Sequence, residues 1–483
     1  MSRLSTYSSA LLLLLLAGCR VPPPAPPPPA IAPAANSSED RFKEADNWHP
    51  SQPSDGVSRG PWWEVFNEPD LNTLEQQIEV SNQDLQAVEA RYRNARAAVS
   101  FYRSAQFPTI WTVPSIAAVK KSRGAPYQNG NPQPTADYLL PFDMSWELDI
   151  WGRVRRLVQA SREEAQASAG DLEYVRLALH SDLALDYFYL RAADAQKNIL
   201  DETVESYRQV LEFNTNRFNE GAAAKSDLTQ AQTQLQSAIV ADSDISVQRS
   251  QFEHAIAILV GKPPSEFSIQ AKVQEFVPPL VPTGLPSQLL ERRPDIASSA
   301  RRVAEANERI GIAKTAYYPT VTLQGIAGFE GHSFPSWLNA PSAFWAIGPI
   351  ANETLFDAGR RRSTQVGAIA SYDQSVANYR SLVLQAFQQT EDALSALRIL
   401  EQEAEQQRQA TASAQESLDL INNRYREGAS PYLAVLTAQA IALSNERNQI
   451  DIERRRMGAT VLLIKALGGG WSQTSLPQFK ELR

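Results

Sequence analysis

Residues 138–149 read YLLPFDMSWELD, and two kinds of side chain alternate along this stretch. One set is aromatic or aliphatic: Tyr138, Leu140, Phe142, Met144, Trp146 and Leu148. The other set is mostly polar and includes Asp143, Glu147 and Asp149. Because successive side chains of a strand point to opposite faces, the pattern predicts a strand at about 137–149 with one apolar and one wet face. About eleven such residues suit a tilted membrane crossing, although a strand of a soluble sandwich has the same alternation.

Three further strands are predicted less sharply, at about 107–119, 318–329 and 345–356. Four tilted strands are too few for a closed barrel, since about eight is the smallest number seen in membranes. Open strand edges cannot remain in hydrocarbon. After the N-terminal segment, the sequence contains no run of about 18 apolar residues, so it predicts no spanning helix. Chains must therefore associate: two would give a barrel filled by side chains, and three would give twelve strands around a lumen.

The body of the chain contains an internal duplication. Residues 82–117 align with 293–328, and residues 152–261 align with 359–468. Matches gather at glycines and element ends, where the backbone restricts residue choice: Asp84/Asp295, Arg91/Arg302, Pro108/Pro319, Gly152/Gly359 and Gly261/Gly468. We divide the body into a first repeat, a Pro-rich linker, a second repeat and a tail, at residues 62–261, 262–292, 293–468 and 469–483.

Each repeat is expected to contain very long helices. Residues 152–213 lack proline and are rich in helix formers, so they predict a helix of roughly 90 Å. Its apolar stripe is narrow, which favours coiled-coil packing; the stripe consists of Leu172, Val175, Leu179, Leu183, Tyr187 and Leu190. The similar segments RFNEGA (217–222) and RYREGA (424–429) predict hairpin turns at Gly221 and Gly428. A long coiled-coil spacer without a pore is the alternative.

The N-terminus carries a targeting signal. An apolar run, Leu11–Leu16, is followed by Ala17, Gly18 and Cys19, the only cysteine of the chain. We expect residues 1–18 to be a lipoprotein signal peptide, Cys19 to be lipidated, and residues 19–61 to form a Pro-rich tether. An ordinary signal peptide before an unmodified thiol is the alternative, but a lone thiol is a liability in an oxidising compartment.

Composition argues against catalysis and against nucleic acid. The net charge is −8, which disfavours polyanionic partners. The four histidines, His49, His180, His254 and His332, show no metal-binding spacing. No phosphate-binding loop or nucleophile motif is present. We therefore expect no enzyme activity, metal or cofactor, and we expect His180 and His254 on helix surfaces.

Four segments together resemble the TolC-like outer-membrane efflux proteins, in the lipoprotein branch that serves RND-type pumps. They are GPWWEVFNEPDL (60–71), WELDIWGR (146–153), LPSQLLERRPDI (285–296) and LFDAGR (355–360). The resemblance covers nearly the whole mature chain. One departure is Ala300, where relatives usually carry Glu.

The resemblance implies a mixed α and β membrane fold. A homotrimer would combine a periplasmic α-helical coiled-coil barrel with a twelve-stranded transmembrane β-barrel in outer-membrane lipid. A periplasmic adaptor protein and an inner-membrane RND-type transporter would be its partners. The function implied is a passive duct for small toxic compounds. An export duct for secreted proteins and a non-pore envelope lipoprotein remain the alternatives.

The resemblance also implies a gate at the periplasmic hairpin tips. Leu433 would face its two symmetry mates as an apolar constriction. Arg424 and Tyr425 would hydrogen-bond toward Asp227 on the neighbouring hairpin, although a solvated helix-end charge is the simpler interpretation of Arg424.

Two positions close to Leu433 in the sequence bear on ion selectivity. Thr437 and Ala434 stand where some relatives have acidic residues around the pore, which argues against a cation-binding ring here. Nearer the outer membrane, Asp143, Glu147 and Asp149 are expected to make the lumen acidic and mildly cation-selective.

Overall fold

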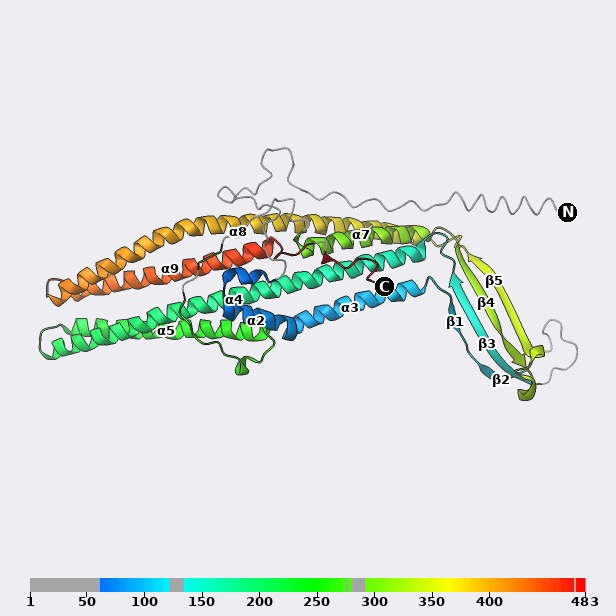
Figure 1. Cartoon of the computed structure of the whole chain (residues 1–483), viewed down its shortest axis with the longest axis horizontal. Coiled ribbons are helices and arrows are strands. Elements are labelled where there is room, and N and C mark those ends of the chain that lie inside the picture. Colours follow the sequence, from blue (N-terminus) through cyan, green and yellow to red (C-terminus); the bar gives the residue numbers. More distant parts are fainter. Residues whose placement is uncertain are drawn as a thin grey trace, which may run out of the picture.

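The computed structural model describes residues 61–120, 134–274, 277–279, 281, 292–472 and 475–482. The molecule is elongated, with two long helical hairpins at one end and an antiparallel sheet at the other (Figure 1). The hairpin helices are α4 (Arg153–Asn219), α5 (Lys225–Leu259), α8 (Arg360–Arg426) and α9 (Tyr432–Ala466). The predicted fold class, which joins very long helices to a strand region, is confirmed.

Corresponding helices of the two halves have equal lengths. Helices α4 and α8 each contain 67 residues, and α5 and α9 each contain 35. Helices α3 (Gln83–Ser104) and α7 (Pro294–Thr315) each contain 22. Gly152 and Gly359, with φ of 82° and 90°, precede α4 and α8. At about 1.5 Å per residue, the longest helices extend about 100 Å.

The sheet joins the two halves. Its strands are β1 (Thr109–Trp111), β2 (Ser115–Val119), β3 (Thr135–Glu147), β4 (Thr320–Gly331) and β5 (Ala343–Asn352). Both β1 and β2 pair with β3, β3 pairs with β4, and β4 pairs with β5, all antiparallel.

Two predicted strands differ most from the structure, whereas β3 and β4 each lie two residues away from the ranges expected at 137–149 and 318–329. The strand expected at 107–119 is divided into β1 and β2, because Pro114 in the connecting segment has no N–H to donate to a ladder. The strand expected at 345–356 occupies 343–352 instead. The first correction leaves a broken edge strand beside β3.

The strand register preserves the predicted alternation across the sheet. Phe142 lies opposite Ala327, which lies opposite Trp345, so these positions share one face. The opposite face carries Asp143, which lies opposite Ile326. Trp345 is 77% exposed in the single chain, so its face is uncovered there.

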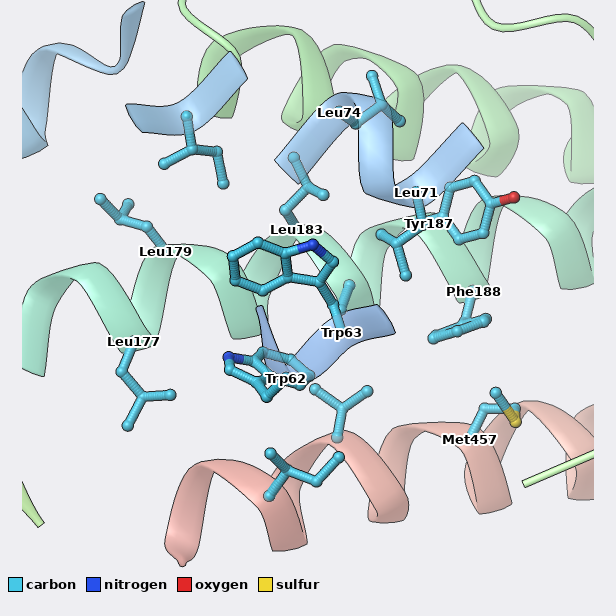
Figure 2. Packing of buried hydrophobic residues seen from close by; sticks show 14 of the residues in the cluster. Trp62, Trp63, Leu71, Leu74, Leu177, Leu179, Leu183, Tyr187, Phe188 and Met457 are labelled. Carbon is cyan, nitrogen blue, oxygen red and sulfur yellow. The ribbon is translucent and has the colours of Figure 1, made fainter. Parts of the chain in front are cut away.

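The largest apolar core lies at mid-length and not at either end. The short helix η1 (Trp62–Phe66) and helix α2 (Pro69–Ser81) cover α4 there, and α9 packs from the other side. Figure 2 shows Trp62 and Trp63 of η1 between the apolar side chains of α4 and α9. The predicted apolar stripe of α4 contributes Leu183 and Tyr187 to this core, and both are fully buried. Among the described residues, no helix is long and apolar enough to cross a membrane.

Candidate functional site

The two hairpin tips have the same backbone geometry. Gly221 and Gly428 both have φ of 75°, a left-handed conformation in which glycine is unstrained. The amide of Gly221 donates to the carbonyl of Phe218 at 3.0 Å, and the amide of Gly428 donates to that of Tyr425 at 3.0 Å. Both turns therefore lie at the glycines that the sequence singled out.

A polar contact joins the two hairpins just behind the tips. The Tyr425 hydroxyl of α8 donates to Asn214 Oδ1 of α4 at 2.9 Å. Arg217 Nη1 donates to the Tyr425 hydroxyl oxygen at 3.2 Å, and its guanidinium lies 5.5 Å from the ring centroid. Phe213 meets the same ring edge-on, with the centroids 6.2 Å apart. In the chain, therefore, the partners of Tyr425 are Asn214 and Arg217, not Asp227.

The contact between Tyr425 and Asn214 is buried. Asn214 is 0% exposed, and its Nδ2 donates to the Val210 carbonyl at 3.0 Å. Burial raises the pKa of Tyr425, so its hydroxyl stays a donor at neutral pH. Sequence reasoning did not identify Asn214. The available signal was a polar residue at helical spacing from Tyr207 and Leu211 on a buried face.

The residues expected at the gate lie at the tips. Leu433, in the first turn of α9, is 62% exposed, and Thr437 Oγ1 one turn later donates to its carbonyl at 3.0 Å. Asp227 lies in the first turn of α5, and Arg424 is exposed near the end of α8. Within the described part of the chain, no ion pair joins Arg424 to Asp227. Within one chain, therefore, Arg424 and Asp227 do not form an ion pair.

The three acidic residues near the sheet are in different environments. Glu147 accepts from Arg153 Nε at 2.8 Å. Asp149 lies beyond the end of β3, and its carboxylate accepts from the amides of Val154 and Arg155, both at 2.9 Å. An Asp before a helix satisfies amides that have no partner in the helix, and this explains why the strand ends before Asp149.

Asp143 differs from the other two acidic residues. No ion pair to it is found among the described residues. The group formed by Asp143, Glu147 and Asp149 is therefore less negative than the sequence suggested. Arg153 and Arg155 neutralise two of its three carboxylates.

The expectation for His180 is wrong, whereas His254 is exposed as expected. His180 is 2% exposed and stacks on Trp63, with ring centroids 4.3 Å apart. Helices α2 and η1 cover this part of α4, which local periodicity did not reveal. His180 also borders a cavity of about 460 Å³ lined by Trp62, Arg176 and other side chains.

Within the described ranges, the His, Cys, Asp and Glu side chains form no group that could hold a metal ion. The expected lipidation site, Cys19, lies outside the described residues.

Comparison with known proteins links this architecture to one family. The model of the outer membrane efflux protein family matches residues 74–262 and 285–469. The probable efflux pump outer membrane protein SepC of Pseudomonas putida is 30% identical over 434 residues, which cover 89% of each chain. The cation efflux system protein CusC of Escherichia coli is 28% identical over 430 residues, covering 87% of this chain and 90% of CusC.

A solved structure matches over nearly the same length. The CmeC outer membrane channel of Campylobacter jejuni superposes with a TM-score of 0.87 at 25% identity, covering 95% of this chain and 96% of CmeC. The likeness therefore includes both helical hairpins and the sheet.

Proposed function

The chain belongs to the outer membrane efflux protein family, and we propose that three copies of it form a lipid-anchored exit duct. It is the outer-membrane component of an efflux pump, and it is a passive channel, not an enzyme. The observation that carries the finer proposal is the two-sided sheet at one end of helices that extend about 100 Å.

The faces of the sheet support a place in the membrane. Trp345 and Ile347 lie two positions apart on the same face of β5, and they are 77% and 60% exposed. An apolar face of this kind needs lipid or protein to cover it. Strands β1 and β2 form one edge of the sheet and β5 forms the other, and their free backbone groups suit pairing with neighbouring chains. We propose that lipid covers the Trp345 face, that Asp143 faces the lumen, and that Cys19 carries the anchor.

The partners and cargo follow from the passive design. A duct without an energy source needs a transporter in the inner membrane and an adaptor in the periplasm, and we propose an RND-type transporter. SepC is named as an efflux pump protein and CusC as a cation efflux protein, and we propose small toxic compounds as the cargo of this chain. We propose that the transporter, and not this duct, selects the cargo.

The closed end of the duct is proposed at the hairpin tips. Leu433 is exposed in a single chain, as a residue that meets its symmetry mates must be. Arg424 would reach Asp227 on the hairpin of the next chain and hold the ring shut. Thr437 lies one turn from Leu433 on the same face of α9 and would line the same ring.

Conductance in planar bilayers tests both the duct and the gate. The full lipoprotein should insert and conduct at a low resting level. Arg424→Ala should raise that level, because losing one member of a charged pair costs about 1–3 kcal/mol. Arg426→Ala is the matched control, since Arg426 is exposed two residues away. Absence of conductance together with tight liposomes would instead identify a non-pore envelope lipoprotein.

A further inference from the structure

An indole lies on the polar face of the sheet. In the register of β1 with β3, Trp111 lies opposite Asp143. The neighbouring Ile110 lies opposite Met144, on the other face. Because directly opposed residues of two strands point to the same face, Trp111 shares the face of Asp143. Trp111 is 44% exposed in the single chain, so its ring is open on the face proposed to line the lumen.

Contact with the membrane does not account for this indole. Aromatic belts at membrane interfaces consist of side chains that face lipid, and Trp345 lies on the face proposed to do so. Trp111 lies on the other face, near the end of the sheet where β1 follows α3 (Figure 1). A neighbouring chain that pairs with the edge of β1 extends the sheet sideways and leaves its faces uncovered. Trp111 therefore stays accessible in the proposed trimer.

Neither member of this pair has a polar side-chain partner in the described part of the chain. No hydrogen bond or ion pair to the Asp143 carboxylate or to the Trp111 indole is found there, and no aromatic ring of the described residues stacks on the indole. The Thr112 hydroxyl donates to the Pro141 carbonyl at 2.6 Å, which holds the backbone immediately after Trp111 against β3. The pair therefore presents an indole and an unpaired carboxylate side by side.

Two other acidic residues on the same face of β3 lack this combination. Glu147 pairs with Arg153 and lies opposite Thr322 of β4. In the duplication, Thr322 is the residue that corresponds to Trp111, so the second repeat has no indole at this position. Asp137 lies opposite an alanine of β2. Within the described strands, an indole directly opposite an unpaired carboxylate therefore occurs at this one point, and a trimer would contain three such pairs.

Organic cations are the ligands that this combination suits. The face of an indole attracts a positive charge more strongly than the face of any other aromatic side chain. The adjacent carboxylate adds Coulomb attraction, and alkyl or aryl groups on the cation gain by leaving water for the ring. A small inorganic cation carries no such groups and gains mainly from the carboxylate. A neutral solvent gains from the ring alone, and an anion is repelled.

We propose that Trp111 and Asp143 form a binding site for organic cations on the wall of the lumen. Trp111 contacts the apolar groups of the cation, and Asp143 faces its positive charge. The proposal rests on the trimeric channel proposed above, and it adds positively charged organic compounds to the cargo as a class that the duct itself recognises. A compound that passes through a duct must also leave it, so the affinity is modest.

Fluorescence anisotropy of ethidium, a planar organic cation, tests the site in the detergent-solubilised full chain, with protein-free micelles as the blank. Trp111→Ala should weaken the affinity about fivefold, and Asp143→Asn should weaken it by at least as much at low salt. Trp111→Phe keeps a ring and should lose less, and it also serves if Trp111→Ala does not assemble. Unchanged ethidium affinity in Trp111→Ala or in Asp143→Asn would overturn the proposal.

Matched variants separate this site from the summed charge of the lumen and from the other tryptophans. Asp137→Asn removes the same charge from the same face at a position without an aromatic partner, so the affinity should change less than about twofold. Trp345→Ala removes an indole from the apolar face and should also leave the affinity within about twofold. Equal losses in Asp137→Asn and Asp143→Asn would mean that ethidium responds only to the summed charge, and the proposal would fall.

The second repeat offers a further control. Thr322→Trp places an indole opposite Glu147, whose charge Arg153 already neutralises. The proposal requires both an indole and an unpaired carboxylate, so this variant should bind no more ethidium per chain than the unmodified protein. A second site of equal affinity in Thr322→Trp would show that an indole alone is sufficient and would contradict the role of Asp143.

Block of the current distinguishes a failure of the site from a failure of the channel. Ethidium should reduce the sodium current in planar bilayers, and the blocking concentration should rise about fivefold in Trp111→Ala. A channel that conducts with unchanged block in Trp111→Ala and Asp143→Asn remains a duct, but the proposed site is then wrong. A protein that never conducts, yet loses ethidium affinity in both variants, would disprove the channel and support the site.

Discussion

His180 Nδ1 lies 2.6 Å from Glu75 Oε2, and the other ring nitrogen lies 3.0 Å from Glu79 Oε1. A neutral imidazole has only one N–H, so two hydrogen bonds to carboxylates require one further proton among the three groups. The cluster joins α2 to α4, and the charged groups that face it are Arg176, which is 2.9 Å from Glu79, and Glu173. The cluster therefore couples the mid-length packing to pH.

Thermal stability should fall as pH rises through neutrality. Burial raises the pKa of Glu75 to about 7, so between its ordinary value and pH 7 the folded chain holds a proton that the unfolded chain releases. Burial alone would lower the pKa of His180, but its hydrogen bonds to Glu75 and Glu79 outweigh that effect and raise it. Both shifts have the same sign, so this stabilisation is complete only below the ordinary pKa of Glu75, 4.5, and is lost as pH rises through about 7. Circular dichroism melting in detergent measures it.

A histidine variant isolates this contribution. His180→Gln should lower Tm at pH 6, since removing one member of a buried charged pair costs about 3–5 kcal/mol. It should remove only the imidazole's part of the pH dependence, because burial, which His180 opposes, raises the pKa of Glu75. Burial also raises the pKa of Asp186 to about 6, so part of the slope should remain. His254→Gln, at an exposed histidine, should leave both Tm and slope unchanged. An unchanged slope in His180→Gln would show that the imidazole does not contribute to the pH dependence.

Asp143 and Asp149 should differ when each is changed to Asn. Asp143 has no ion-pair partner in the described ranges, so Asp143→Asn should reduce cation preference, measured as a reversal-potential shift in a salt gradient. Asp149 accepts from two amides of α4 and pairs with Arg155 at 3.0 Å. Asp149→Asn keeps only one acceptor oxygen, so it should mainly cost about 1 kcal/mol of stability. The opposite assignment of effects would place Asp149 in the lumen.

The tip should be insensitive to divalent cations. Thr437 and Ala434 offer no carboxylates near Leu433, so millimolar divalent cations should leave conductance unchanged. Thr437→Asp would place three carboxylates in a trimeric ring and should introduce a block that rises with cation concentration. Thr437→Asn is the uncharged control. A block in the unmodified channel would reveal a cation site elsewhere.

Two glycines with similar φ should tolerate alanine unequally. At Gly221 a Cβ would meet open space, so Gly221→Ala should cost only the left-handed strain of about 1–2 kcal/mol. At Gly261 a Cβ would lie 2.3 Å from the Ser81 carbonyl oxygen, so Gly261→Ala must displace the junction of α2 and α3 as well. Thermal melting should show the larger loss for Gly261→Ala. Equal losses would mean that this junction yields without cost.

The sequence by itself determined the features that depend on local rules. Period-two alternation at 138–147 predicted the two faces of β3, because strand geometry alone sends neighbouring side chains to opposite sides. Gly221 and Gly428 marked the hairpin turns, because few other residues take a left-handed conformation without strain. The duplication and the family resemblance extended these local predictions to the whole architecture.

Only the tertiary structure decided which polar groups are buried and what they contact. Tyr425 meets Asn214 across 211 residues, and His180 meets Glu75 across 105. Both contacts depend on how hairpins and covering helices pack. Residues on one helix face look alike in sequence whether a distant segment covers them or water does. The alternating sequence pattern likewise placed Asp149 in the strand. The structure shows instead that the Asp149 carboxylate accepts from the Val154 amide, a contact that exists only once the first turn of α4 has formed.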